Sequence, residues 1–124
     1  MYDEDRELTR YILNHYPHLL TGLELRVTQA IRARAKSAEA SSPNMAEMLN
    51  RRWGAPGDCE VEAALAAGPE AYERKIRDRL LAEHAAVVIV NRCRRCERVV
   101  RTPQARQCFW CGFEWHDSEA ESDA

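Results

Sequence analysis

The spacing of apolar residues predicts five helices in the first 85 residues of this chain. They are expected at residues 3–16, 21–38, 42–53, 59–67 and 69–85. The last one carries its large side chains four positions apart, which gives a continuous inward stripe: Tyr72, Ile76, Leu80 and His84. The pattern therefore predicts a mostly α fold, a small helical bundle.

Several helix boundaries have clear signals. Pro17 ends the first helix, because proline cannot continue the hydrogen-bond pattern. Thr21 and Glu24 have the spacing of a capping box at the start of the second. Ser42 can cap the third, with Pro43 in its first turn. The large apolar residues of this third helix line one face: Met45, Met48, Leu49 and Trp53. Core packing is expected for this face, and the alternative is that Met45, Met48 and Trp53 form a partner-binding stripe.

The pattern changes after residue 85. Residues 86–90 are short and β-branched, which predicts a strand. Residues 97–101 and 105–108 are expected to pair as a β-hairpin around a turn at 102–104. The predicted organisation is a helical bundle at 1–86, a docked C-terminal module at 87–116 and an acidic, disordered tail at 117–124.

Charge is unevenly distributed, although the net charge is only −2. Residues 91–116 hold six arginines against Glu97 and Glu114, whereas residues 117–124 contain four acids and no base. Any surface that binds a polyanion must therefore be local. The longest apolar run, at residues 85–90, is too short to cross a bilayer, and the acidic N-terminus does not resemble a signal peptide. These features predict a cytoplasmic protein without a membrane partner.

Four cysteines form two Cys-x-x-Cys pairs, Cys93 with Cys96 and Cys108 with Cys111, separated by eleven residues. In a reducing compartment this spacing indicates metal ligands rather than disulfides, and it is typical of a tetrahedral zinc site. Iron is the alternative, because sulfur ligands alone do not separate the two metals. Four thiolates leave no open coordination position, which predicts a structural ion. Cys59, flanked by acids, is expected to be an inert thiol.

The last quarter of the chain resembles a four-cysteine zinc ribbon. Its final stretch, residues 106–116, reads RQCFWCGFEWH. The chain is similar to small uncharacterised bacterial proteins that place such a ribbon, ending in an RQCxxCGxxWH-like stretch, after a helical N-terminal part. The resemblance implies zinc binding and no particular activity. Many such turns have a glycine directly after their second cysteine, as Gly112 follows Cys111 here. The first pair departs from this pattern, because Glu97 follows Cys96.

Arginines and aromatic residues surround the cysteines, and this combination is typical of a macromolecule-binding surface. The candidate contact residues are Arg94, Arg95, Arg98, Arg101, Arg106, Trp110 and Trp115. The same residues could instead offset thiolate charge and fill a small core. The hypothesis is a non-catalytic protein adaptor; an RNA- or DNA-binding regulator is the alternative. No catalytic motif is present, so an enzyme is only a remote alternative, and no small-molecule substrate is predicted.

Overall fold

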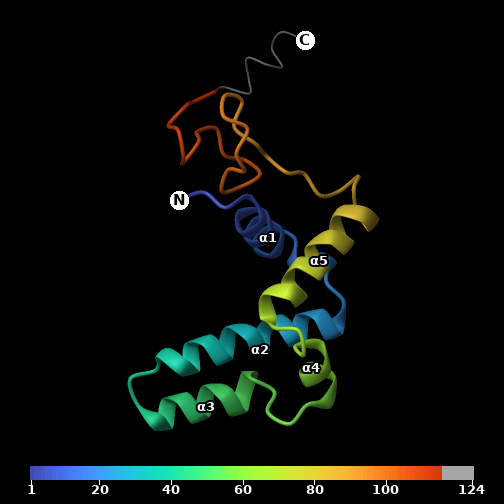
Figure 1. Ribbon diagram of the computed structural model, residues 1–124, viewed down its shortest axis with the longest axis vertical. Helices are drawn as coiled ribbons and strands as arrows, with labels where there is room; N and C mark the ends of the chain where they lie inside the picture. The colour runs from blue at the N-terminus through green and yellow to red at the C-terminus, as the bar shows by residue number, and fades with distance from the viewer. Residues whose placement is uncertain (116–124) are drawn as a thin grey trace. The chain divides into compact units, whose positions relative to one another are not determined.

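The computed structural model describes residues 1–115 of the chain, and this part is mostly helical (Figure 1). The predicted acidic tail and His116 lie outside the described residues. The helices are α1 (Glu4–His15), a 3-10 turn η1 (Pro17–Leu19), α2 (Gly22–Glu39), α3 (Pro43–Trp53), α4 (Cys59–Ala64) and α5 (Pro69–Glu83). The five predicted helices are confirmed, with ends that shift by up to three residues.

The helix starts form as the sequence predicts. Thr21 Oγ1 accepts the N–H of Glu24 at 3.1 Å, and the Glu24 carboxylate accepts the N–H of Thr21 at 2.9 Å. Ser42 Oγ accepts an N–H at the start of α3, where Pro43 has no N–H to satisfy. Such local hydrogen bonds depend only on neighbouring residues, and this makes them readable from sequence.

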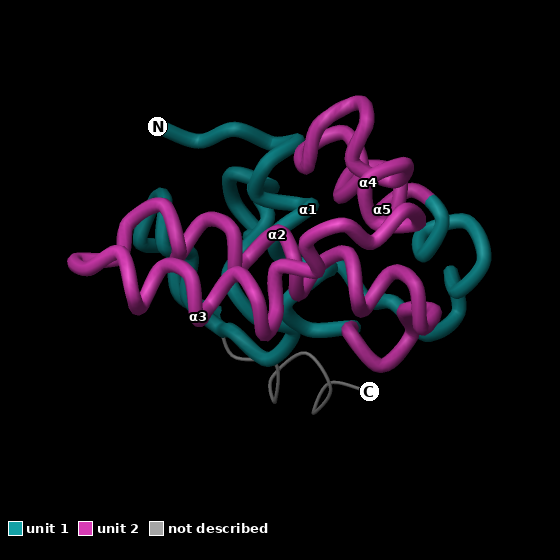
Figure 2. The backbone as a smooth tube through the Cα atoms, turned by 90° about the horizontal axis from the view of Figure 1, so that it is seen from below, with its two compact units in different colours: residues 1–16, 79–124 teal, residues 17–78 magenta. Residues whose placement is uncertain are grey.

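The chain divides into two compact units (Figure 2). Unit 1 joins residues 1–16 with residues 79–124, and unit 2 contains residues 17–78. The boundary expected between residues 86 and 87 lies inside unit 1. The four paired cysteines therefore belong to the same unit as α1.

Unit 2 is built on α2, which packs against α3 and α4. Figure 1 shows α2 and α3 running side by side as a helical hairpin. Val27 and Ala30 of α2 and Val61 of α4 form a cluster in which all three are fully buried. Ion pairs also join α2 to α4, with Arg34 Nη2 at 2.8 Å from Glu62 and Arg26 Nη2 at 2.6 Å from Glu60.

The predicted inward face of α3 is wrong. No residue of α3 is buried, and Met45, Met48 and Trp53 remain 46%, 56% and 45% exposed. The contact of α3 with α2 is instead made partly by polar groups, because Ser37 Oγ of α2 donates to the carbonyl of Ala46 at 2.9 Å. Apolar spacing identified the helix correctly but did not reveal whether a neighbour covers that face.

The strand expected at residues 86–90 is also absent, and within residues 1–115 the structure contains no strand. Tyrosines of unit 1 take the place of a partner strand. Tyr16 Oη accepts the Ile89 N–H at 2.9 Å, and the hydroxyls of Tyr11 and Tyr16 both donate to the Ile89 carbonyl. Tyr11 Oη also accepts the Asn91 N–H at 3.2 Å. Earlier in the segment, the N–H groups of Val87 and Val88 both donate to the carbonyl of His84 at 2.9 Å. The tyrosines and this turn give these backbone groups partners without a ladder.

Candidate metal centre

The cysteines lie on two turns with nearly identical hydrogen bonds. Cys93 Sγ accepts the N–H groups of Arg95 and Cys96, each at 3.3 Å. Cys108 Sγ accepts the N–H groups of the residues two and three positions later, at 3.3 and 3.4 Å. N–H groups aimed at sulfur favour the thiolate form, which is the form that binds metal.

Each turn closes on a residue in the left-handed region. Glu97 has φ 64° and Gly112 has φ 81°. Their N–H groups donate to the carbonyls of Cys93 and Cys108, both at 3.0 Å. The departure noted in the sequence therefore changes the residue and not the shape of the turn: Glu97 adopts the conformation that glycine adopts without steric cost.

The predicted hairpin between residues 97–101 and 105–108 is not present. Only isolated bridges occur in the described residues, and each one flanks a single turn: Arg92 with Val99, and Gln107 with Glu114. Each cysteine turn thus pairs its own two ends. The connection between the turns is held by side chains instead of by a ladder.

The side chain of Asn91 makes the hydrogen bonds that hold this connection. Its buried carboxamide nitrogen donates to the carbonyls of Thr102, Pro103 and Ala105 at 3.0, 3.2 and 3.0 Å. Its oxygen accepts from Arg94 Nη1 at 2.9 Å. One side chain therefore fixes the loop that joins the two turns, and sequence reasoning did not single it out.

The four sulfurs converge between the turns. They lie within 4.8 Å of one another, and the shortest separations are 3.6 Å, from Cys93 to Cys111 and from Cys96 to Cys108. Sulfurs at about 2.3 Å from a tetrahedral ion lie about 3.8 Å apart, so the donor set fits such an ion. All five cysteines are free, and 3.6 Å is far longer than a disulfide. The cluster can hold a metal ion.

The thiols of the first turn differ in acidity. Burial raises the pKa of Cys93, but the N–H groups of Cys96 and Arg95 outweigh it, and the pKa falls to about 6. The N–H of Arg98 lowers the pKa of Cys96, whereas burial and the neighbouring thiols, first that of Cys108, raise it to about 11. Four sulfurs this close cannot all be anionic without a cation between them.

The N-terminal residues pack on the first turn. Tyr2 Oη accepts the N–H of Val99 at 2.9 Å, and its ring meets Trp110 edge to face, with centroids 5.1 Å apart. Arg92 pairs with both carboxylate oxygens of Glu4, at 2.7 and 3.2 Å, and this hydrogen bonding raises the pKa of Arg92. These contacts join residues almost a hundred positions apart, so no local sequence signal points to them.

The predicted contact residues fall into two groups. The five arginines (Arg94, Arg95, Arg98, Arg101 and Arg106) are all exposed. Trp115, by contrast, is 8% exposed and belongs to a core cluster with Cys93 and Cys108, and Trp110 packs against that cluster. The indole Nε1 atoms of both tryptophans are buried. The tryptophans thus help to form the core around the cysteine cluster.

Four exposed arginines stack on aromatic rings. The guanidinium carbons lie at these distances from ring centroids: Arg94 to Trp115 4.7 Å, Arg95 to Phe113 6.0 Å, Arg98 to Tyr2 5.2 Å and Arg101 to Phe109 3.8 Å. Of these rings, Phe109 is the most open, at 60% exposed. Stacking fixes the planes of the guanidinium groups. Arg94 also donates through Nη1 to the oxygen of Asn91 and to the carbonyl of Arg92, at 2.9 and 2.6 Å.

Comparison with protein-family models, curated proteins and solved structures finds no match for this chain. No helix within residues 1–115 is long and apolar enough to cross a membrane. Statements about function therefore depend on the centre itself.

Proposed function

We propose that the four cysteines bind one zinc ion in a closed, structural site of the zinc-ribbon type. The observation that carries the proposal is the convergence of four sulfurs from two matching turns within 4.8 Å. With four thiolates around a tetrahedral ion, no position remains for water or substrate, so the centre is non-catalytic. The ion supplies stability that a segment of this size cannot gain by burial alone.

Metal analysis of the purified full chain tests this proposal. One zinc per chain is expected, and Cys93→Ser and Cys108→Ser should each lower the metal content strongly. Cys59→Ser is the matched control, because Cys59 is exposed, belongs to unit 2 and lies outside the cluster. If iron is found in place of zinc, the identity of the metal in this proposal is wrong. If the metal content survives both ligand substitutions, the assignment of the cysteines as ligands is wrong.

We further propose that the metal-ordered module acts as an adaptor that contacts an acidic protein surface. The support is the excess of exposed arginines around a centre whose tryptophans are packed inward. A nucleic-acid partner is the second candidate, and the observation favouring it is Arg101 stacked at 3.8 Å on the exposed ring of Phe109.

Affinity capture with the metal-loaded chain separates these candidates. A protein partner should persist after nuclease treatment and be lost when Arg94, Arg95 and Arg98 are replaced by glutamine. The control bait carries Arg51→Gln and Arg52→Gln, which remove exposed arginines from unit 2. Loss of all captured material on nuclease treatment, with a steep salt dependence, would favour nucleic acid instead.

A further inference from the structure

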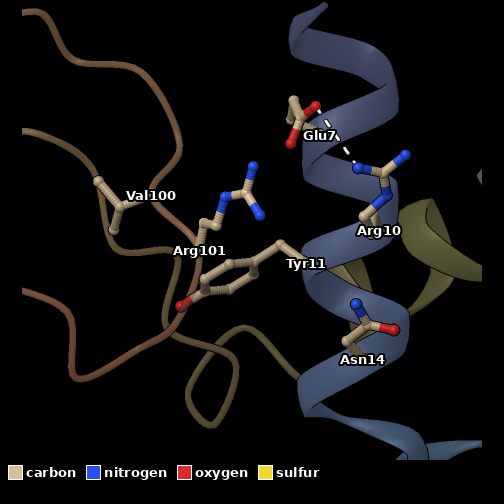
Figure 3. Close-up of a pocket in the computed structure, with 6 residues that line it drawn as sticks. All are labelled: Glu7, Arg10, Tyr11, Asn14, Val100 and Arg101. Carbon is tan, nitrogen blue, oxygen red and sulfur yellow. Dashed lines mark ion pairs between the residues drawn. The ribbon is translucent and has the colours of Figure 1, made fainter. Parts of the chain in front are cut away.

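A small polar cavity lies in unit 1, apart from the cysteine cluster. It has a volume of about 90 Å³ and is lined by Glu7, Arg10, Tyr11, Asn14, Val100 and Arg101. Figure 3 shows the first four on α1, with Tyr11 pointing toward the segment that carries Val100 and Arg101, and with Arg10 turned along the helix toward Glu7. Their spacing of three and four residues places them on one face of the helix.

The floor of this cavity is rigid. Tyr11 is 3% exposed and its hydroxyl is engaged by the backbone at Ile89 and Asn91. Val100 is 1% exposed and its N–H donates to the Asn91 carbonyl at 3.0 Å. A ligand would therefore meet walls that need little ordering when it binds.

Arg101 is held in position for such a ligand. Its guanidinium stacks on Phe109 at 3.8 Å, and its carbonyl is bonded by His15 Nε2 of α1 at 2.9 Å. Within residues 1–115, no carboxylate pairs with this guanidinium. Its planar fork of N–H donors matches the geometry of an oxyanion.

The guanidinium of Arg10, the second cation of the cavity, is only weakly paired with a carboxylate. Arg10 Nη1 lies 3.8 Å from the carboxylate of Glu7, at the long end of an ion pair, and the Arg10 side chain is 52% exposed. A long ion pair with a half-exposed arginine is weak, so a doubly charged anion can compete with Glu7. Two cations and one anion leave the lining with net positive charge.

We infer that this cavity binds a phosphate group, held between Arg10 and Arg101 with the Asn14 carboxamide as a third polar contact. The volume is several times the space that one water needs, which suits a tetrahedral oxyanion and excludes a large organic molecule. The source is either free inorganic phosphate or the phosphate of a nucleotide whose base stacks near Phe109. This inference does not depend on the partner proposed for the arginine surface.

Titration of the metal-loaded full chain with inorganic phosphate tests the inference. Amide and side-chain NMR signals are followed at constant ionic strength, with chloride as the balancing anion. Saturable shifts centred on Asn14 and Arg101 are expected, with a dissociation constant of about 1 mM or lower. AMP in a parallel titration identifies the source: tighter binding indicates a nucleotide, and weaker binding indicates the free ion.

Substitutions give effects of opposite sign. Arg10→Gln and Arg101→Gln should each weaken binding by about tenfold, because each removes a charge-assisted hydrogen bond. Glu7→Gln should tighten it by up to about tenfold, because it removes a competing carboxylate from the cavity. Arg98→Gln is the control, since Arg98 stacks on Tyr2 and does not line the cavity.

The inference is overturned by no saturable shift up to about 10 mM phosphate, where a 1 mM site would be about 90% filled. It is also overturned if Arg98→Gln weakens binding as much as the two cavity variants do, which would indicate a general charge effect. Metal content and circular dichroism of every variant confirm that it is folded. Since Arg10→Gln changes only an exposed helical side chain, at least one cavity variant remains usable.

Discussion

Asn91 offers the sharpest test of how the metal centre is held together. The substitution Asn91→Leu keeps the side-chain shape and removes every polar atom beyond the backbone. Three carbonyls, those of Thr102, Pro103 and Ala105, lose a donor at 3.0–3.2 Å, and Arg94 loses an acceptor at 2.9 Å. Because Asn91 is 8% exposed, water cannot fully replace these partners.

The expected loss of unfolding free energy follows from the number of hydrogen bonds that are removed. Each net hydrogen bond contributes about 1 kcal/mol, and a buried carbonyl left without a donor costs about 1–3 kcal/mol. The apolar leucine offsets part of this loss, since its burial is favourable. We expect unit 1 to lose about 2–4 kcal/mol of unfolding free energy. The loop between the two turns should also loosen, so a chelator should remove the metal faster.

The assay must report on unit 1 alone. Trp53, one of three tryptophans, belongs to unit 2, and it is 45% exposed, so Trp53→Phe is a mild background change. Urea unfolding followed by fluorescence then reports on Trp110 and Trp115. Asn14→Leu is the control, because Asn14 is exposed in the same unit. A loss below about 0.5 kcal/mol for Asn91→Leu, the range of ordinary surface substitutions, would refute the reasoning.

Three further predictions follow from the same unit. Tyr16→Phe removes the acceptor of the Ile89 N–H at 2.9 Å and should cost about 1–2 kcal/mol in urea unfolding; an unchanged midpoint would contradict the role given to this hydroxyl. Glu97→Gly should stabilise the first turn by about 0.5–1 kcal/mol, because φ is 64° there. Gly112→Ala should destabilise the second turn, because φ is 81° there. Changes in unfolding free energy of the same sign for the two variants would contradict this prediction. The pKa of Cys96, about 11, means that this thiol is protonated at neutral pH, so metal binding must displace its proton. Apparent metal affinity should therefore rise with pH between 6 and 9, by at least about tenfold per unit, as measured by competition with a chelator of known pH dependence; a flat profile would contradict it.

Much of the fold follows from local signals. Helix ends at Thr21 and Ser42 are set by hydrogen bonds between residues three apart, so the sequence specifies them directly. The two cysteine turns are equally local, because each is closed by N–H groups within three residues of its first sulfur. The convergence of the two turns is not local, and it was predictable from the spacing of the two Cys-x-x-Cys pairs, which is typical of a metal site.

The errors have a common cause. β-branched residues at 86–90 predict a strand, but a strand needs a partner, and here Tyr11 and Tyr16 supply the hydrogen bonds. Met45 and Met48 have the spacing of a buried face, yet within residues 1–115 they remain 46% and 56% exposed. Propensity and periodicity describe what a segment can do, while its surroundings decide what it does.

The sequence by itself therefore determined the helices, their caps and the two cysteine turns, because each depends on residues a few positions apart. Only the tertiary structure decided what lies around the cysteine cluster: Tyr2 and Glu4 on the first turn, Asn91 across the connecting loop, and Arg10 and Arg101 in the lining of one cavity. Those contacts join residues 11 to 97 positions apart through single side chains. Such contacts leave no periodic pattern in the sequence, because each one depends on a single polar side chain. Many polar residues could make such a contact, and only the folded structure shows which of them has a partner nearby.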